Sequence, residues 1–488
     1  MKKSICFLLM IFLAASFVFS EPSNYTYNYD FWDEQVASPD AYRVSDYILG
    51  AALGAGHFRE PQGLFISGNR IYVCDSGNNR IVVIEARENG EHVFVDSYSS
   101  VIIDGEESFF SYPMDLFVSR EGFIYIADTN NLRILKLDKD WNYISSITRP
   151  YDESIDDYVE FHPHKLVVDF ANRVFVQVRN VNKGLMEFDS RGEFAGYMGA
   201  NKVRYKFTDY VWKTIATQAQ RERMVLFVPT EYNNICLDSD GFIYVTNSSS
   251  TVTITKKTKE SDHVRRLNAM GQDILIRNGY FPPIGDLAFG TAGGISGPSR
   301  FIDVVAFDND SYACFDRTRG RIFLYDFQGN LLYAFGGLGN REGSFTMPVA
   351  LDRMGDVLYA LDSRTAAITR FELTSYGAKI NEALNEYKAG RYDSSALIWE
   401  DVLKMNGNYD LAYIGIGRAA LRQGEYKKAM EYFKIKRYRT GYGKAFQLYR
   451  KQWIEENLWK ILLVLVFIVV VPAAVRFFIK IYREIKEA

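Results

Sequence analysis

The chain has 488 residues but only four cysteines and five histidines. Cys6 lies in the first apolar run, which leaves Cys74, Cys236 and Cys314 in the rest of the sequence. An odd number of cysteines spread over separate strand patterns does not make a disulfide framework. We therefore expect three buried free thiols.

Catalytic and phosphate-binding signatures are also missing. The sequence contains no Gly-x-Ser-x-Gly elbow, no His-Glu-x-x-His and no phosphate loop. His162 and His164 flank Pro163, and a spacing this unspecific is more typical of ordinary loop residues than of a metal site. The formal net charge of −3 gives the whole chain no attraction for nucleic acid, so no nucleic-acid partner is expected.

Long apolar runs occur only near the two ends of the chain. Two lysines after Met1 and a run from Ile5 to Phe19 that ends before Glu21 are typical of a secretory signal, which we place at residues 1–20. The alternative is an uncleaved membrane anchor. Either case predicts that the body of the chain is exported.

The second apolar run, Leu458 to Ile479, is long enough to cross a bilayer as one helix. Trp459, Lys460 and Arg476 stand near its ends, where lipid headgroups would lie. Pro472 leaves open a buried or re-entrant hairpin instead. We predict a single-pass protein of the cytoplasmic membrane, with residues 480–488 as a cytoplasmic tail and the bulk of the chain outside the cytoplasm, periplasmic or at the cell surface.

Between these runs a strand-turn-strand pattern recurs. Each copy has alternating apolar residues, an aspartate, a turn rich in Gly, Asn, Ser or Thr, and an arginine five positions after the aspartate, which is typical of a β-hairpin. Repeated units of short strands indicate a propeller or an array. The clearest copies are Ile71 to Ile81, Ile124 to Ile134 and Tyr312 to Ile322.

Aligning the turns gives six units at intervals of about 46–69 residues, a spacing that suits one four-stranded propeller blade each. The residues from Ala41 to Leu49 precede the first complete unit, whereas the last unit ends early, near Leu373. We therefore predict that this early segment supplies the outermost strand of the last blade and closes the ring. The aligned turn positions are Asp75, Asp128, Val178, Asn247, Asp316 and Asp362.

These units resemble NHL repeats. The resemblance is carried by Pro-x-Gly-Leu at Pro61, by Ile-Tyr-Val-x-Asp-x-x-x-x-Arg-Ile at Ile71 and by the run from Val264 to Gly271. It implies a mainly β fold, a six-bladed β-propeller over residues 41–375, with an N-terminal segment at residues 21–40. A stretch of helical composition at residues 201–224 is expected to be an insertion.

The period becomes helical from Tyr376 onward. Gly390 and Tyr392 recur 34 residues later as Gly424 and Tyr426, and Trp399 recurs as Phe433. This spacing resembles the tetratricopeptide repeat, which implies a small helical region at residues 376–457 before a transmembrane helix at residues 458–479. Two repeats make a short solenoid, because each unit buries its apolar face only against a neighbour.

Four polar residues are the candidate ligand-binding site. If the first strand of each unit lines the axis, the third residue of each strand faces the mouth of the central channel: Asp115, Lys165, Asn234 and Asp303 are polar, and Gly63 and Ala350 are small. Such oxygen ligands suit a hard cation such as Ca²⁺ or a polar ligand such as a sugar. The alternative is that Lys165 simply neutralises the carboxylates, and it argues against a tight cation site. We predict no catalytic residue and no cofactor, with Asp115, Asn234 and Asp303 as weak metal candidates.

The repeated aspartates and arginines have a structural role available. A carboxylate at these turns can accept backbone N–H groups, and an arginine leaves the same hairpin. Because they recur in several units, we interpret them as residues that stabilise each blade and not as a unique site. They are Asp75, Arg80, Asp128, Arg133, Asp316, Arg321 and Asp362.

These features predict an extracytoplasmic, membrane-anchored binding or scaffold protein whose partner is a protein, such as a membrane complex, or a saccharide. The alternative is a metal-dependent lactonase or esterase with its site in the channel. Related propeller lactonases hold a divalent metal with Glu, Asn and Asp, for which Glu60, Asn234 and Asp303 are the stand-ins here. The motifs that surround those ligands in lactonases are not evident.

Overall fold

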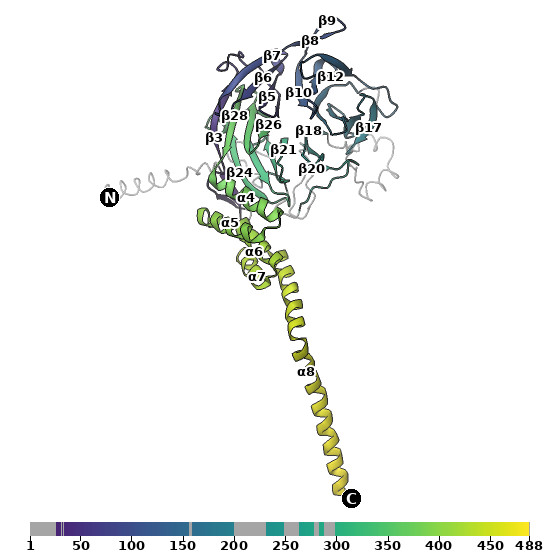
Figure 1. Ribbon diagram of the computed structural model, residues 1–488, viewed down its shortest axis with the longest axis vertical. Coiled ribbons are helices and arrows are strands. Elements are labelled where there is room, and N and C mark those ends of the chain that lie inside the picture. The colour runs from purple at the N-terminus through teal and green to yellow at the C-terminus, as the bar shows by residue number, and fades with distance from the viewer. Residues whose placement is uncertain are drawn as a thin grey trace, which may run out of the picture. The chain divides into compact units, whose positions relative to one another are not determined.

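The structure is a computed structural model that describes residues 26–30, 32, 34–155, 159–199, 231–247, 263–277, 283–286 and 298–487. The predicted signal at 1–20 and the predicted insertion at 201–224 lie outside the described residues. The chain forms two compact units, Met1–Ala378 and Lys379–Ala488. The first is built of β-sheets and the second of helices (Figure 1).

The first unit is a β-propeller in which five antiparallel blades of at least four strands each are described. Alternating β-branched and aromatic residues form each strand, and short turns join neighbours. Four of the blades follow one another along the chain as meanders. They are β4 (Gly63–Ser67), β5 (Arg70–Asp75), β6 (Arg80–Ala86) and β7 (His92–Tyr98); β10 (Pro113–Val118), β11 (Ile124–Asp128), β12 (Arg133–Leu137) and β13 (Tyr143–Ile147); β14 (Pro163–Val168), β15 (Val174–Val178), β16 (Leu185–Phe188) and β17 (Phe194–Met198); β21 (Phe301–Ala306), β22 (Tyr312–Asp316), β23 (Arg321–Tyr325) and β24 (Leu331–Leu338).

The remaining blade takes its strands from both ends of the propeller sequence. It consists of β26 (Pro348–Met354), β27 (Val357–Asp362), β28 (Ala367–Leu373) and β3 (Tyr42–Leu49). Strand β3 pairs antiparallel with β28 from Leu49 opposite Ala367 to Tyr42 opposite Leu373. The predicted closure by the segment near residues 41–49 is therefore confirmed, and it covers an edge that would otherwise be open.

Between β17 and β21 lies a sheet that has three strands in the described part of the chain. It consists of β18 (Tyr232–Leu237), β19 (Ile243–Asn247) and β20 (Val264–Leu267). Tyr232 pairs with Asn247 in the same register in which Pro163 pairs with Val178 and Pro113 with Asp128. The alignment of Val178 and Asn247 with the repeated aspartates is thus confirmed by strand pairing.

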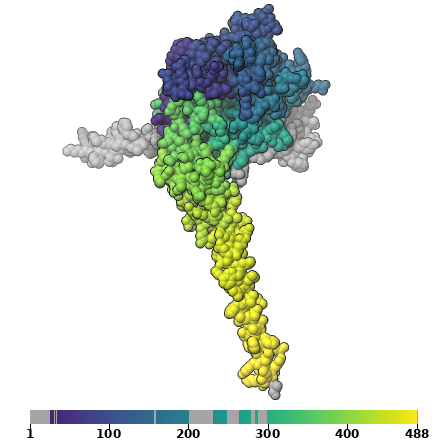
Figure 2. Space-filling view, in the orientation of Figure 1, coloured from purple at the N-terminus to yellow at the C-terminus, as the bar shows by residue number. Residues whose placement is uncertain are grey.

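The first strands of the sheets stand next to one another around the axis. Each of β4, β10, β14, β18 and β21 neighbours the next, and β26 neighbours both β21 and β4. In the space-filling view, segments that follow one another in the sequence cover neighbouring parts of the visible face of this unit (Figure 2). Apolar layers between adjacent sheets form the core. One layer, for example, joins Tyr72 and Val83 of one blade to Leu116 and Ile126 of the next.

Three additions to the propeller were not predicted from the sequence. Strand β1 (Thr26–Tyr29) pairs with the outer edge of β24 and with β2 (Gln35–Ala37), so residues of the expected N-terminal segment extend that blade. A separate hairpin, β8 (Ser100–Ile103) and β9 (Glu106–Phe109), lies between β7 and β10, and β25 (Ser344–Phe345) pairs with β24.

The second unit contains helices of ordinary length and one long helix. Gly424 ends α6 in a left-handed conformation, φ 84°, that glycine adopts without strain. Helix α8 contains Pro472 and a window long and apolar enough to cross a membrane, none of it buried. The helices are α4 (Ser375–Lys388), α5 (Tyr392–Met405), α6 (Asp410–Gln423), α7 (Tyr426–Ile435) and α8 (Arg439–Glu487).

Candidate binding site

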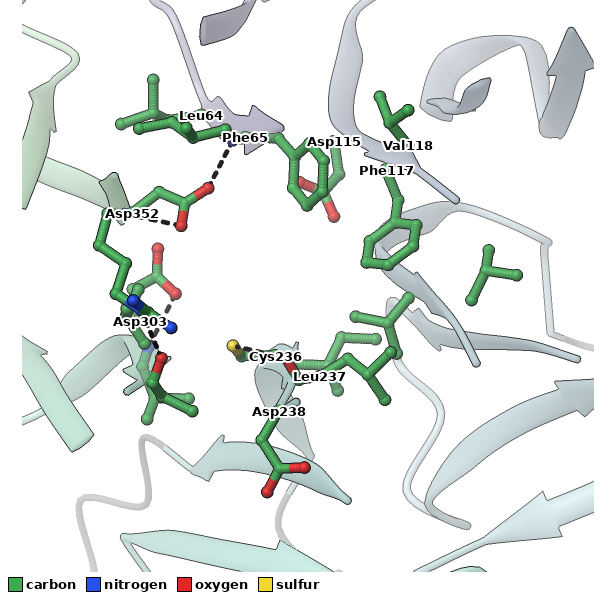
Figure 3. Close-up of a pocket in the computed structure, with 18 of the residues that line it drawn as sticks. Leu64, Phe65, Asp115, Phe117, Val118, Cys236, Leu237, Asp238, Asp303 and Asp352 are labelled. Carbon is green, nitrogen blue, oxygen red and sulfur yellow. Dashed lines mark hydrogen bonds between the residues drawn. The ribbon is translucent and has the colours of Figure 1, made fainter. Parts of the chain in front are cut away.

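A cavity of about 440 Å³ lies among the first strands of the propeller sheets. It is lined by β4, β10, β14, β18, β21 and β26 and by the turns that follow these strands (Figure 3). Side chains alternate along each strand, so every second residue points toward the axis. The lining consequently forms successive levels along the strands.

The level at the start of the strands contains the four polar residues expected from the sequence. Asp115, Lys165, Asn234 and Asp303 all line the cavity, and each is only 2% to 9% exposed. The two small residues at equivalent positions do not line it. Gly63 stands where a Cβ atom would lie 2.5 Å from the carbonyl oxygen of Met114, so glycine permits close approach of two strands.

Asp115 and Lys165 form an ion pair across two neighbouring blades. Lys165 Nζ lies 3.3 Å from Asp115 Oδ1, and the other carboxylate oxygen accepts the backbone N–H of Leu166 at 2.9 Å. Both side chains are nearly excluded from solvent, and a buried charge is retained when it is paired. This pairing supports the interpretation that Lys165 neutralises a carboxylate of the channel.

Asp303 has no basic side chain bonded to it among the described contacts. Its Oδ2 accepts the N–H of Leu351 from the next blade at 2.7 Å, and its Oδ1 accepts the N–H of Val304 at 2.7 Å. Burial raises the pKa of Asp303 to about 7, although nearby Lys165 opposes the shift. Asn234 joins sheets in a similar way, because its Nδ2 donates to the carbonyl of Ile302 at 3.0 Å.

Asp352 is a further cavity residue, and it was not predicted from the sequence. Its Oδ2 accepts the N–H of Ile66 at 2.6 Å, and its Oδ1 accepts the N–H of Arg353 at 2.8 Å. Burial raises its pKa to about 7, and the carboxylate of Asp303 adds to the shift. Strand alternation could have identified Asp352, because it lies two residues beyond Ala350 and therefore on the same face of the strand.

Above the polar level the lining is mostly apolar. The rings of Phe65 and Phe117 come from adjacent blades, and their centroids are 4.9 Å apart. Val167, Cys236 and Val305 occupy the equivalent positions on three other strands. Figure 3 shows Phe65, Phe117, Cys236 and Asp352 around the open space. A ligand in the cavity would therefore contact aromatic and aliphatic surface together with Asp352, which lies at the same level.

Two arginines border the cavity, Arg353 near the end of β26 and Arg120 on the turn after β10. Arg353 is held by Asp308, at 2.7 Å, and its Nε donates to the carbonyl of Ala306. Arg120 stacks on Phe170, with its guanidinium carbon 3.5 Å from the ring centroid. Both guanidinium groups have partners at the rim.

The residues present do not fit a divalent metal in the manner of a lactonase. Within the described ranges no group of three or more His, Cys, Asp or Glu side chains could hold a metal ion. Asp115 is paired with an ammonium, and both oxygens of Asp303 accept backbone N–H groups. Glu60, the third stand-in, is not among the cavity residues. These side chains therefore give no support to a lactonase-like metal site.

The repeated aspartates lie in the hairpin turns and make the contacts expected of structural residues. Asp75 is fully buried; its Oδ2 receives Arg80 Nε at 2.7 Å, and its Oδ1 receives the N–H of Arg59 at 2.6 Å. Asp128 repeats this arrangement with Arg133, at 2.7 Å, and with the N–H of Ser111, at 2.7 Å. In both blades the carboxylate is thus hydrogen-bonded to the connection that precedes the blade and to the arginine of the hairpin within it.

The last two members of the set differ. Asp316 accepts the N–H groups of Arg300 and Thr318 and the hydroxyl of Ser299, while Arg321 bonds Asp286 and Tyr27 instead of Asp316. The blade containing Arg321 also carries β1, and Arg321 Nη1 donates to the hydroxyl of Tyr27 on that strand at 2.9 Å. Asp362 accepts the N–H groups of Met347 and Arg364 without an arginine side chain.

Residues 58–84 match the NHL repeat. The matched stretch contains β4, β5 and most of β6, and with them the patterns at Pro61 and Ile71 that carried the resemblance in the sequence; the run from Val264 to Gly271 lies outside it. No curated protein sequence matches the chain.

Several solved structures are similar to this chain at low sequence identity. Virginiamycin B lyase from Staphylococcus aureus has 11% identity and a TM-score of 0.39, covering 68% of this chain and 100% of its own. A streptogramin B lyase has 13% identity and a TM-score of 0.41, with coverage of 69% and 100%. A protein proposed to be a gluconolactonase has 9% identity and a TM-score of 0.40, with coverage of 69% and 94%. Similarity at this level carries no argument about activity.

Proposed function

We propose that this chain is a membrane-anchored binding protein that holds a ligand or a partner's side chain in the central cavity of its propeller. The observation that carries the proposal is the cavity of about 440 Å³, with the aromatic pair Phe65 and Phe117 above a set of fixed polar groups. Ligand pockets in proteins typically combine apolar walls with a few placed polar groups. The partner is a protein or a saccharide.

The proposed scaffold has six blades. In support, β18, β19 and β20 keep the register of the complete blades, and β18 occupies its place between β14 and β21 at the axis. A fourth strand for this sheet would come from residues beyond Leu267. The proposal thus treats the three-stranded sheet as a blade of the same kind.

The proposed helical region is tetratricopeptide-like. In support, Gly417 of α6 lies against Phe433 of α7, where a Cβ atom would come 2.6 Å from the ring. The 34-residue recurrence of Gly390 and Tyr392 as Gly424 and Tyr426 falls at the starts of α5 and α7. Pairs of such helices present grooves that suit peptide binding.

The apolar part of α8 is proposed to anchor the chain, with the propeller outside the cytoplasm. The run Leu458 to Ile479 lies within α8 and is unburied, which suits contact with lipid. The basic start of the chain and the apolar run after it support export. A hydrolase in the cavity is the alternative, and the poor fit of its residues to a metal makes it the weaker one.

The proposal is tested with the full chain in detergent on arrays of peptides and glycans. Phe117→Trp adds bulk at the cavity, whereas Val95→Trp makes the same kind of change at an exposed site on β7. We expect retained ligands to be lost with Phe117→Trp and kept with Val95→Trp, with thermal unfolding confirming that both variants fold. Turnover of lactones or esters that a chelator abolishes, with no retained ligand, would overturn the proposal.

A further inference from the structure

The cavity contains more negative than positive groups. Asp115, Asp303 and Asp352 line it, while the single lysine, Lys165, pairs with Asp115. The two bordering arginines are engaged elsewhere, Arg353 with Asp308 and Arg120 on Phe170. Asp303 and Asp352 therefore face the space with no basic side chain hydrogen-bonded to either in the described contacts.

The groups that hold these two carboxylates are backbone amides. Each oxygen of Asp303 and Asp352 accepts one N–H, and a carboxylate oxygen has capacity for a further donor. Ionised carboxylates donate nothing, so they select ligands rich in donors. A hydroxyl offers one donor, whereas an ammonium offers three and brings the opposite charge.

The apolar level restricts what can carry the cation. Phe65, Phe117 and Val305 line the cavity at the same level as Asp352, so a ligand whose cation lies between Asp303 and Asp352 has its stem beside them. Aromatic faces attract cations, and they also pack against aliphatic stems. The apolar lining with Phe65 and Phe117 therefore suits both parts of an alkylammonium. The volume of about 440 Å³ exceeds what a single small ion needs and falls within the range of organic ligands.

From this arrangement we infer that the cavity binds an organic cation, an ammonium or guanidinium group on an apolar stem such as a lysine or arginine side chain presented by a peptide. The cation lies between Asp303 and Asp352, and the stem lies along Phe65 and Phe117. This inference rests on the proposed binding function and specifies its ligand class. It favours a basic protein segment over a neutral saccharide.

Binding of a cation should release protons. Burial raises the pKa of both Asp303 and Asp352 to about 7, so part of each is protonated at neutral pH in the free protein. The charged groups around them are Lys165 on β14, Asp115 on β10 and Arg353 on β26. A bound cation favours the ionised carboxylates and lowers their pKa, so affinity should rise between about pH 6 and pH 8.

The test uses the full chain in detergent and isothermal titration with a matched set of small probes. n-Pentylammonium, 1-pentanol and pentanoate share one stem and differ in charge, and glucose represents a neutral saccharide. We expect n-pentylammonium to bind at least tenfold more tightly than 1-pentanol and pentanoate to show no binding. Titration in buffers of different ionisation enthalpy should show proton release with the ammonium alone.

Two substitutions test whether Asp352 is responsible for binding the ammonium group. Asp352→Asn keeps an acceptor for Ile66 N–H and should weaken n-pentylammonium at least tenfold, whereas Asp140→Asn removes one exposed charge on the β12–β13 turn and should leave affinity within twofold. Equal binding of 1-pentanol or glucose, or no change with Asp352→Asn, would overturn the inference of a cation. Glucose binding alone would overturn it while leaving the proposed binding function intact, and failure of every array ligand would remove both.

Discussion

The Oδ2 atom of Asp303 accepts the backbone N–H of Leu351 at 2.7 Å, across the boundary between two neighbouring blades. Asp115 makes the same contact with Leu166, and Asp352 makes it with Ile66. Side chains that line the cavity thus also join adjacent first strands. A substitution at these positions is expected to change blade packing together with any binding.

Stability should fall as pH rises through the titration of the buried cavity carboxyls. Asp303 and Asp352 have a pKa raised to about 7 by burial, so between about pH 4 and 7 the folded chain binds more protons than the unfolded chain. Their contribution therefore becomes less favourable with rising pH and levels off above pH 7. The double variant Asp303→Asn, Asp352→Asn removes this effect.

The measurement is chemical denaturation of both proteins in detergent at pH 5 and pH 8. Relative to the double variant, wild type should lose about 2–3 kcal/mol of unfolding free energy per carboxyl, about 5 kcal/mol for the two, between these two pH values. A constant difference between the two proteins would mean that neither carboxyl is perturbed.

Asp75→Ala should destabilise the propeller strongly. It leaves the Arg80 side chain and the N–H of Arg59 without their acceptor in a fully buried place, a loss of about 3 kcal/mol by comparison with other broken buried pairs. Glu88→Ala on an exposed turn should change stability by less than about 0.5 kcal/mol. Denaturant midpoints measure both, and equal effects would contradict a structural role for Asp75.

Two adjacent residues of β3 test the ring closure. Ile48 is 2% exposed and Leu49 is 43% exposed, although both are aliphatic and both pair with β28. Ile48→Ala should cost about 2–4 kcal/mol through lost burial and the space left behind, whereas Leu49→Ala should cost under about 1 kcal/mol. Thermal unfolding of the full chain separates them, and similar losses would argue against docking of β3 as described.

Glycine substitutions test the packing of the helical unit. A Cβ atom at Gly417 would lie 2.6 Å from the Phe433 ring, while at Gly443 of α8 nothing lies within 4 Å. Gly417→Ala should therefore destabilise this unit by about 1–3 kcal/mol. Gly443→Ala should stabilise it by up to about 1 kcal/mol, because alanine favours the helix. Helix melting followed by circular dichroism reports both signs, and stabilisation by Gly417→Ala would refute the contact.

The repeating parts of the fold could be predicted because they are encoded locally. The pattern from Ile71 to Ile81 specifies two strands and their turn, and its recurrence specifies the sheets. The closure by β3 could be predicted by counting the strands of each unit, because the last unit lacks one strand and an unassigned strand precedes the first unit. Tyr232 and Asn247 kept the register even without the aspartate.

The parts that escaped prediction depend on contacts distant in sequence. Strand β1 packs on β24 through Tyr27, which lies within reach of Arg321, and nothing near Thr26 in the sequence indicates that partner. Asp352 lies two residues beyond the third position of its strand, so a prediction based on the third positions alone does not include it. The convergence of Asp115, Lys165, Asn234 and Asp303 on one cavity was accessible from their shared position in the repeat.

The pairing of β3 with β28 also determines when the propeller can become complete. Strand β3 leaves the ribosome before any whole blade, and its partner β28 follows only after the other blades have been synthesised. The early strand must therefore wait unpaired while the remaining sheets form. The propeller can therefore fold as one cooperative unit only late in synthesis, when the carboxyl-terminal part of the domain pairs with a segment made at its beginning.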